Sequence, residues 1–192
     1  EKGYGLIALP FSMRSDSVLA RDWIEEAHAA LALGGVLLAG TDHPDAIWLY
    51  KAIKSVFGAA SLKRETALRG CLVSARRRLK QAKIRDRRHT ANIRLRTQEF
   101  SIRTRPGIFG YRRLDPGTRA IIEVARVGKG QTVADIGCGP GTIGLVLGRE
   151  TGGAVILCDS SQRATELARE NAKANAVPAE VLTAPDLSAQ SL

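Results

Sequence analysis

The residues best placed for chemistry in this 192-residue chain are an acid and three alternating glycines, in the run Asp135–Gly141 (sequence DIGCGPG). Residues 132–134 predict a buried strand before this run, and residues 142–147 predict the first turns of a helix after it. The glycines therefore occupy a strand-to-helix turn, where a ligand can approach the backbone because no Cβ intervenes and where positive φ angles are favoured. The pattern predicts a loop that binds a nucleotide cofactor.

Two cofactors compete for this loop. Gly139, Gly141 and Gly144 satisfy the Gly-x-Gly-x-x-Gly pattern of nicotinamide-dinucleotide proteins, which leaves a dehydrogenase as one interpretation. Against it, Pro140 removes a backbone donor that a pyrophosphate would need, and the carboxylate of Asp135 repels an anion. The ammonium and sulfonium groups of S-adenosylmethionine suit a carboxylate instead. The loop thus favours S-adenosylmethionine over NAD.

A second apolar run, residues 154–158, predicts a buried strand that ends at Asp159, where the acid can accept hydrogen bonds from ribose hydroxyls. With these features the chain resembles the class I S-adenosylmethionine-dependent methyltransferases, whose first motif is similar to Asp135–Gly141. The resemblance implies a Rossmann-like α/β fold. It also implies cofactor-binding residues, with Asp159 at the ribose and Asp186 near the adenine amino group: Asp135, Gly137, Cys138, Gly139, Gly141, Asp159 and Asp186.

The segment before this domain narrows the resemblance. Residues 100–109 followed by residues 113–118 (RLDPGT) are similar to the entry segment of the two-domain guanine-N2 methyltransferases of small-subunit (16S) ribosomal RNA. This implies that Phe109 and Thr118 line the cofactor pocket. It also implies methyl transfer to the exocyclic N2 of a guanine, with ribosomal RNA or the small ribosomal subunit as partner.

Charge is concentrated in one segment. The chain has 29 basic and 19 acidic residues, and residues 76–105 hold twelve of the basic and two of the acidic ones, so the remainder is balanced at seventeen each. A basic helix or mobile linker here would attract a polyanion, and RNA is the natural candidate. The alternative is a solvated linker without a ligand. The predicted RNA contacts are Arg76, Arg77, Arg78, Lys80, Lys83, Arg85, Arg87 and Arg88.

Strands and helices alternate before the basic segment. The patterns predict strands over residues 4–10 and 36–40, a strand region over 66–75, a helix over 16–33 that Gly34 and Gly35 stop, and a helix over 45–57 that Gly58 caps. Such alternation implies parallel strands with helices on the faces of the sheet. The segment resembles the C-terminal half of a methyltransferase domain.

This first half resembles the degenerate domain of the two-domain enzymes. Active members carry Asn-Pro-Pro-Phe, in which the Asn accepts a hydrogen bond from the target amine; here the tetrad is Ala8-Leu9-Pro10-Phe11, so this copy should be inert. We therefore expect a fragment with the C-terminal part of a degenerate domain (1–78), a basic linker (79–99) and the N-terminal part of a catalytic domain (100–192). Catalytic residues are expected beyond Leu192.

Other functions stay open at this stage. A protein-glutamine N5 methyltransferase shares the first motif, and a non-catalytic RNA-binding assembly factor would share the fold. Cys71, Cys138 and Cys158 have no metal-ligand spacing and are expected to be reduced, which favours the cytoplasm and predicts no metal. No apolar run approaches membrane-spanning length, so no membrane partner is expected.

Overall fold

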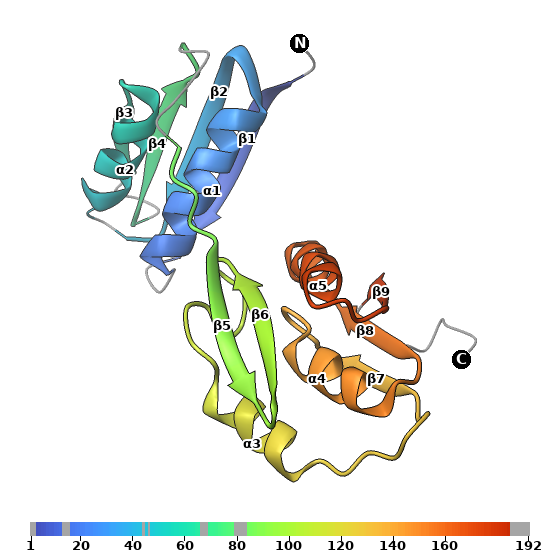
Figure 1. The fold of residues 1–192 in the computed structure, drawn as a ribbon. Helices are drawn as coiled ribbons and strands as arrows, with labels where there is room; N and C mark the ends of the chain where they lie inside the picture. Colours follow the sequence, from blue (N-terminus) through green and yellow to red (C-terminus); the bar gives the residue numbers. More distant parts are fainter. Residues whose placement is uncertain are drawn as a thin grey trace. The chain divides into compact units, whose positions relative to one another are not determined.

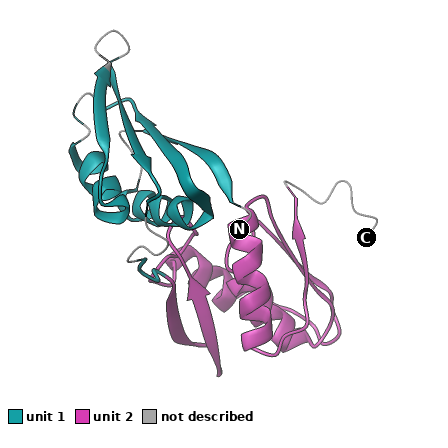
Figure 2. Ribbon diagram, turned by 90° about the horizontal axis from the view of Figure 1, so that it is seen from above, with its two compact units in different colours: residues 1–87 teal, residues 88–192 magenta. Residues whose placement is uncertain are grey.

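A computed structural model describes residues 3–12, 16–43, 45, 47–65, 69–78 and 84–184. The chain divides into two compact units, residues 1–87 (unit 1) and residues 88–192 (unit 2), shown in different colours in Figure 2. Each unit has its own hydrophobic core.

Unit 1 is a four-stranded mixed sheet in the order β1-β2-β4-β3, with two helices on one face (Figures 1 and 2). Its elements are β1 (Tyr4–Phe11), α1 (Ser17–Ala30), β2 (Leu31–Thr41), α2 (Ile47–Phe57), β3 (Ser61–Glu65) and β4 (Gly70–Arg76). The predicted parallel pairing is confirmed for β1 and β2 but is wrong for β4, which runs antiparallel to both β2 and β3. Only a few residues separate β3 from β4, and a parallel pair would need a much longer crossover.

The glycine pair Gly34-Gly35 lies inside a strand, contrary to the predicted helix stop. Helix α1 ends at Ala30, and the extended Leu31 begins β2 directly. The pairing register between β1 and β2 then shifts, which accommodates extra residues of β2 as an irregularity. Gly34 has φ +84°, and a Cβ on Gly35 would lie 2.8 Å from the carbonyl oxygen of Tyr4. These glycines are therefore needed for the strand irregularity.

Unit 2 combines a β-hairpin with a parallel three-stranded sheet in the order β7-β8-β9 (Figure 1). Its elements are β5 (His89–Leu95), β6 (Gln98–Thr104), α3 (Pro116–Val124), β7 (Val133–Ile136), α4 (Thr142–Thr151), β8 (Val155–Asp159), α5 (Gln162–Ala174) and β9 (Glu180–Thr183). The strand, glycine turn and helix predicted around Asp135 are confirmed, as is the strand that ends at Asp159.

The hairpin corrects the predicted linker 79–99. Residues 89–95 form β5, whose side chains alternate between half-buried and exposed, and pair with β6 in unit 2. The residues His89–Leu95 alternate with a period of two, which is typical of a strand. The high charge of the surrounding segment favoured the interpretation as a linker instead. Residues 84–88 form neither helix nor strand, while Lys80 and Lys83 lie outside the described residues.

Two buried asparagines, Asn171 in α5 and Asn175 at its C-cap, hold the hairpin in place. The side chain of Asn171 accepts a hydrogen bond from the Arg103 N–H (2.8 Å) and donates to the Arg103 carbonyl (2.9 Å). Asn175 makes the same pair of bonds with Ser101, both at 2.8 Å. Asn171 also donates to the carbonyl of Pro140 (2.9 Å). The two amides thus fix β6 beside α5, and Asn171 ties it to the glycine loop.

Among the described residues, no helix combines the length and the apolar character that a membrane span requires.

Candidate cofactor-binding site

The glycine loop adopts the left-handed backbone that its sequence predicts. Gly137, Gly139 and Gly141 have φ angles of +72°, +54° and +84°, a region that favours glycine. The N–H groups of Gly137 and Cys138 both donate to the carbonyl of Cys158, at 2.8 and 2.9 Å. Gly141 then caps the N-terminus of α4. The loop is consequently a tight turn anchored to the end of β8.

Gly144, the third glycine of the pattern, serves helix packing. A Cβ at this position would lie 2.4 Å from Leu157 Cδ2 and 2.9 Å from the Cβ of Asp135. Because Leu157 is completely buried, it has no room to retreat. Gly144 therefore lets α4 approach β7 and β8 closely, which is the packing role expected of a third glycine.

Asp135 is a desolvated acid at the end of β7. Burial raises the pKa of its carboxyl above the usual value; a hydrogen bond from the Gly144 N–H (2.8 Å) opposes this pKa shift, and the charge of Asp159 adds to it. A cation placed beside this partly desolvated carboxylate would stabilise its charged form. The residue is suited to a positively charged ligand group.

Asp159 braces the same loop from the end of β8. Its Oδ2 accepts a hydrogen bond from the Gly139 N–H (2.9 Å), and its Oδ1 accepts one from the Ser161 N–H (2.8 Å). Each carboxylate oxygen has a further lone pair for another donor. The acid thus has a structural role besides the predicted contact with ribose.

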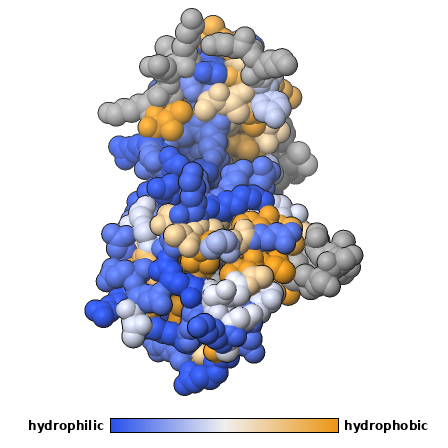
Figure 3. Space-filling view, turned by 45° about the vertical axis from the view of Figure 1, so that its right-hand side comes forward, coloured by the Kyte–Doolittle hydropathy of each residue, from blue (hydrophilic) through white to orange (hydrophobic). Residues whose placement is uncertain are grey.

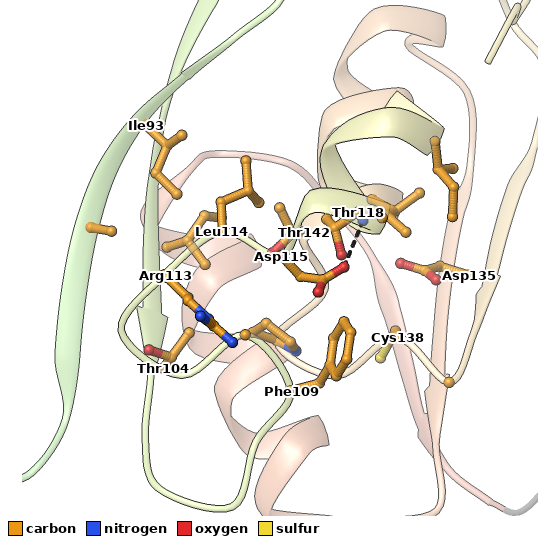
Figure 4. Close-up of a pocket in the computed structure, with 18 of the residues that line it drawn as sticks. Ile93, Thr104, Phe109, Arg113, Leu114, Asp115, Thr118, Asp135, Cys138 and Thr142 are labelled. Atoms are coloured by element: carbon orange, nitrogen blue, oxygen red, sulfur yellow. Dashed lines mark hydrogen bonds between the residues drawn. The ribbon is translucent and has the colours of Figure 1, made fainter. Parts of the chain in front are cut away.

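A cavity of about 320 Å³ opens beside the loop, within unit 2 (Figure 4). It is lined by the hairpin, by the segment between Phe109 and Ile121, and by the loop and helix start from Asp135 to Ile143. Of the predicted cofactor residues, five line the cavity: Phe109, Thr118, Asp135, Gly137 and Cys138. Gly139, Gly141 and Asp159 do not line it and support the loop instead. Asp186 lies outside the described residues.

Five polar residues that were not predicted as site residues also line the cavity: His89, Thr104, Arg113, Asp115 and Thr142. Asp115 is the N-cap of α3 and accepts a hydrogen bond from the Thr118 N–H (3.0 Å). An Asp followed by Pro is a helix-start signal, so Asp115 was recognisable as a cap. Arg113 belongs to the segment 113–118 that carries the family resemblance, but the resemblance gave it no role.

The cavity has opposed polar walls and an aromatic side chain between them. Figure 4 shows Asp135 and Cys138 on one side and Arg113 and Thr104 on the other, with Phe109 between. Phe109 is 66% exposed. Apolar residues also gather on the face of unit 2 seen in Figure 3. The cavity therefore offers both charge and apolar surface to a ligand.

The thiol of Cys138 is a much weaker acid than that of an ordinary cysteine. Burial raises the pKa of its thiol to about 12, and the charges of Asp135 and Asp159 act in the same direction. The three cysteines all lie within the described residues and form no disulfide. The described part of the chain also holds no group of three His, Cys, Asp or Glu side chains that would suit a metal ion.

The predicted RNA cluster divides into two groups. Arg77 donates to the carbonyls of Ala29 and Leu31 at the end of α1, and Arg87 forms an ion pair with the buried Glu25. These two arginines have structural contacts in unit 1. The remaining described members are exposed: Arg76, Arg78, Arg85 and Arg88. Of these, Arg76 also donates to the carbonyl of Gly34. Contact with RNA stays a prediction for the cluster.

The comparisons with known proteins agree on one kind of protein, the methyltransferases. Residues 99–191 match the sequence model of the methyltransferase small domain. Ribosomal RNA small subunit methyltransferase C of Chromohalobacter salexigens is 30% identical over 162 residues, 82% of this chain and 47% of that protein. Its namesake in Pseudoalteromonas translucida is 31% identical over 113 residues, 58% of this chain and 33% of that protein. The chain thus spans about half or less of the length of these relatives.

Both units share their fold with a solved methyltransferase. The structure of the T. thermophilus 16S rRNA N2 methyltransferase (RsmC), in complex with AdoMet and guanosine, matches with a TM-score of 0.81 at 20% identity. The match covers 98% of this chain and 52% of that one. It confirms the predicted Rossmann-like methyltransferase fold. Through the domain at residues 99–191, the chain belongs to the methyltransferase small domain family of class I methyltransferases.

Proposed function

We propose that unit 2 binds S-adenosylmethionine, and that the chain belongs to an enzyme that methylates the exocyclic N2 of a guanine in small-subunit ribosomal RNA. The observation that carries this proposal is the cavity beside the glycine loop, which exposes the carboxylates of Asp115 and Asp135 in a largely apolar wall. Acids at this place favour a cationic cofactor over a pyrophosphate.

The residues present fit S-adenosylmethionine group by group. Asp135 would attract the positive charge of the methionine end, Asp159 would accept from the ribose hydroxyls, and Asp186 would lie near the adenine. Gly137 leaves the backbone open to the ligand, since nothing lies within 4 Å of a Cβ built there. When bound, the sulfonium supplies an activated methyl group to an amine. The chain's own contribution is to hold the donor in line with the acceptor and to exclude water.

Unit 1 has no catalytic role in this proposal. The carboxyl end of β1 carries Ala8-Leu9-Pro10-Phe11, and the Ala8 side chain has no acceptor for an amine proton. The 192 residues contain no Asn-Pro-Pro. The group that orients the acceptor amine is therefore expected outside these 192 residues, and unit 1 serves binding or support.

The names of the relatives support RNA as the substrate over the glutamine side chain of a protein. The net charge of +10, concentrated around residues 76–105, suits a polyanion as well. We infer a cytoplasmic location from this substrate class. A non-catalytic RNA-binding assembly factor remains the second candidate, since such a protein would share the fold.

Calorimetric titration of the 192-residue chain with S-adenosylhomocysteine and with NAD tests the cofactor. We expect binding of the sulfur cofactor and no measurable heat with NAD. Saturable NAD binding without a response to S-adenosylhomocysteine would overturn the assignment. An Asp159→Ala variant should bind S-adenosylhomocysteine more weakly by about 1.5–3 kcal/mol, the range for hydrogen bonds to a charged group.

A further inference from the structure

The charged side chains that line the cavity match the charges of the proposed cofactor. Asp115, Asp135 and Arg113 supply two negative charges and one positive charge. S-adenosylmethionine carries two cations, its ammonium and its sulfonium, and one anion, its carboxylate. The cavity therefore holds a counter-charge for each ionic group of this cofactor.

We propose that Arg113 and Asp115 together bind the zwitterionic amino-acid end of the cofactor, an assignment that rests on the proposed function. The Arg113 guanidinium binds the α-carboxylate, and the Asp115 carboxylate binds the α-ammonium. Both ligand groups are attached to one carbon atom, so their partners must lie close together. Arg113 and Asp115 meet this condition because they are two residues apart and line the same cavity.

The position of Arg113 fits the amino-acid end and not the ribose end. Asp159, the predicted ribose partner, does not line the cavity and accepts a hydrogen bond from the Gly139 N–H of the loop. Arg113 lies across the cavity from Asp135 and Cys138 (Figure 4). A cofactor that reaches from Asp159 past the loop into the cavity would place its far end, the amino acid, beside Arg113.

Arg113 and Asp115 also make hydrogen bonds within the protein, and the test variants must keep them. Arg113 donates its backbone N–H to the Gly110 carbonyl (3.1 Å), a bond that Arg113→Gln retains. Asp115 caps α3 through Thr118. Because Asn is as good an N-cap as Asp, Asp115→Asn removes the charge and keeps the cap. Arg112 provides the control: its guanidinium lies over the Tyr111 ring (5.1 Å to the centroid), and it does not line the cavity.

The test compares two ligands that differ only at the amino-acid end. S-adenosylhomocysteine has the zwitterion, and 5′-methylthioadenosine lacks it. In calorimetric titrations of the full 192-residue chain, Arg113→Gln and Asp115→Asn should each weaken S-adenosylhomocysteine binding by about tenfold or more, the effect of one charge-assisted hydrogen bond. Both variants should bind 5′-methylthioadenosine like the wild type. Arg112→Gln should change neither affinity.

Each contrary result has a separate meaning. Equal losses for both ligands would show a structural effect and overturn the inference. If Arg113→Gln binds S-adenosylhomocysteine normally but binds a short single-stranded RNA more weakly, Arg113 contacts a phosphate and the inference is wrong. If the wild type binds neither adenosine ligand, the proposed function itself fails. Normal S-adenosylhomocysteine binding by both variants overturns the inference and leaves the proposed function intact.

Discussion

Asp135 and Gly144 meet at the start of α4, where one supplies charge and the other supplies space. The Gly144 N–H donates to Asp135 Oδ2 at 2.8 Å, and the absence of a side chain on Gly144 brings the helix close to the acid. The geometry of the carboxylate thus depends on a residue that contacts no ligand in our proposal. The two residues can be tested separately.

A methyl group at Gly144 should destabilise unit 2. Gly144→Ala places a Cβ 2.4 Å from Leu157 Cδ2, and overpacking of this kind costs about 1–3 kcal/mol. Urea denaturation followed by far-UV circular dichroism measures the loss. Gly40→Ala in β2 is the control, since nothing lies within 4 Å of its Cβ. Equal stability of Gly144→Ala and the wild type would show that α4 can move away from the sheet.

Neutralising Asp135 should weaken the cofactor and spare the fold. Asp135→Asn keeps an oxygen that accepts from Gly144 and removes a buried charge, so its free energy of unfolding at pH 7 should equal or exceed that of the wild type. Binding of S-adenosylmethionine should fall by about tenfold. Titration calorimetry and urea denaturation at matched pH measure the two effects. A loss of stability without a loss of affinity would contradict the proposed role.

The same acid gives a pH dependence of defined sign. The pKa of Asp135 in the folded protein is raised above its value of 3.8, so the folded state binds more protons than the unfolded state between those two pKa values. The free energy of unfolding of the wild type should therefore rise relative to that of Asp135→Asn as the pH falls through the native pKa. A gap that widens in favour of Asp135→Asn at lower pH would contradict the burial of this carboxylate.

The site residues that could be predicted from the sequence are those whose position follows from neighbouring residues in the chain. Asp135, the glycines and Asp159 follow strands directly, so their spacing along the chain fixes their place. Arg113 and Asp115 enter the same cavity from a segment that comes earlier in the chain and reaches the loop only through the tertiary fold. The spacing of residues along the chain cannot show that this segment approaches the glycine loop.

Helix α1 is joined to part of the basic segment by an ion pair and a hydrogen bond. Glu25 of α1 is 7% exposed and pairs with Arg87, which is 12% exposed; one nitrogen–oxygen contact of the pair is 2.9 Å. The Arg85 N–H donates to the same carboxylate at 3.1 Å. Part of the basic segment therefore belongs to the packing of α1, whatever the remainder binds.

Removing Arg87 should destabilise unit 1 because it leaves a buried carboxylate without its partner. Arg87→Ala is expected to cost about 3–5 kcal/mol. Arg85→Ala retains the backbone contact and should change stability by less than about 0.5 kcal/mol. The two tryptophans of the chain, Trp23 and Trp48, both lie in unit 1, so tryptophan fluorescence during urea denaturation reports this unit alone. Similar losses in both variants would show that the effect does not come from the Arg87–Glu25 ion pair.

Neutralising three members of the predicted RNA cluster should reduce the salt dependence of RNA binding. The triple variant Arg78→Gln, Lys80→Gln, Lys83→Gln should bind RNA more weakly and lower the slope of log affinity against log salt by about two to three units. The loss should be similar across RNA sequences. Fluorescence anisotropy over a range of salt concentrations measures it. An unchanged slope would mean that the cluster is a solvated linker.

The elements that the sequence mispredicted share a physical cause. Gly34 and Gly35 resemble a helix stop, yet they allow a strand irregularity whose partner strand is β1, more than twenty residues earlier. The strand His89–Leu95 was hidden by the charge around it, and its identity depends on pairing with β6. Long-range pairing decides both cases. Helix α2 with its Gly58 cap, a local structure, was predicted correctly.

For the whole molecule, we expect that the 192-residue chain transfers no methyl group. Unit 2 offers residues for the cofactor, whereas Ala8 at the end of β1 cannot accept from an amine and the sequence holds no Asn-Pro-Pro. Incubation with radiolabelled S-adenosylmethionine and undermodified small ribosomal subunits is the measurement, with the Chromohalobacter salexigens methyltransferase as positive control. Label in the RNA would place the acceptor site within these residues.

The burial of Cys138 bears on a hazard that any methyl donor carries. A thiolate beside a sulfonium would be alkylated by the protein's own cofactor, because the thiolate is the nucleophilic form of cysteine. With a pKa of about 12, roughly one Cys138 side chain in a hundred thousand is ionised at neutral pH. The acids that attract a cationic cofactor to this loop also keep its neighbouring sulfur protonated. Burial is the largest cause of the raised pKa of Cys138 and the charges of these acids add to it, so cofactor binding and protection against alkylation share part of their origin.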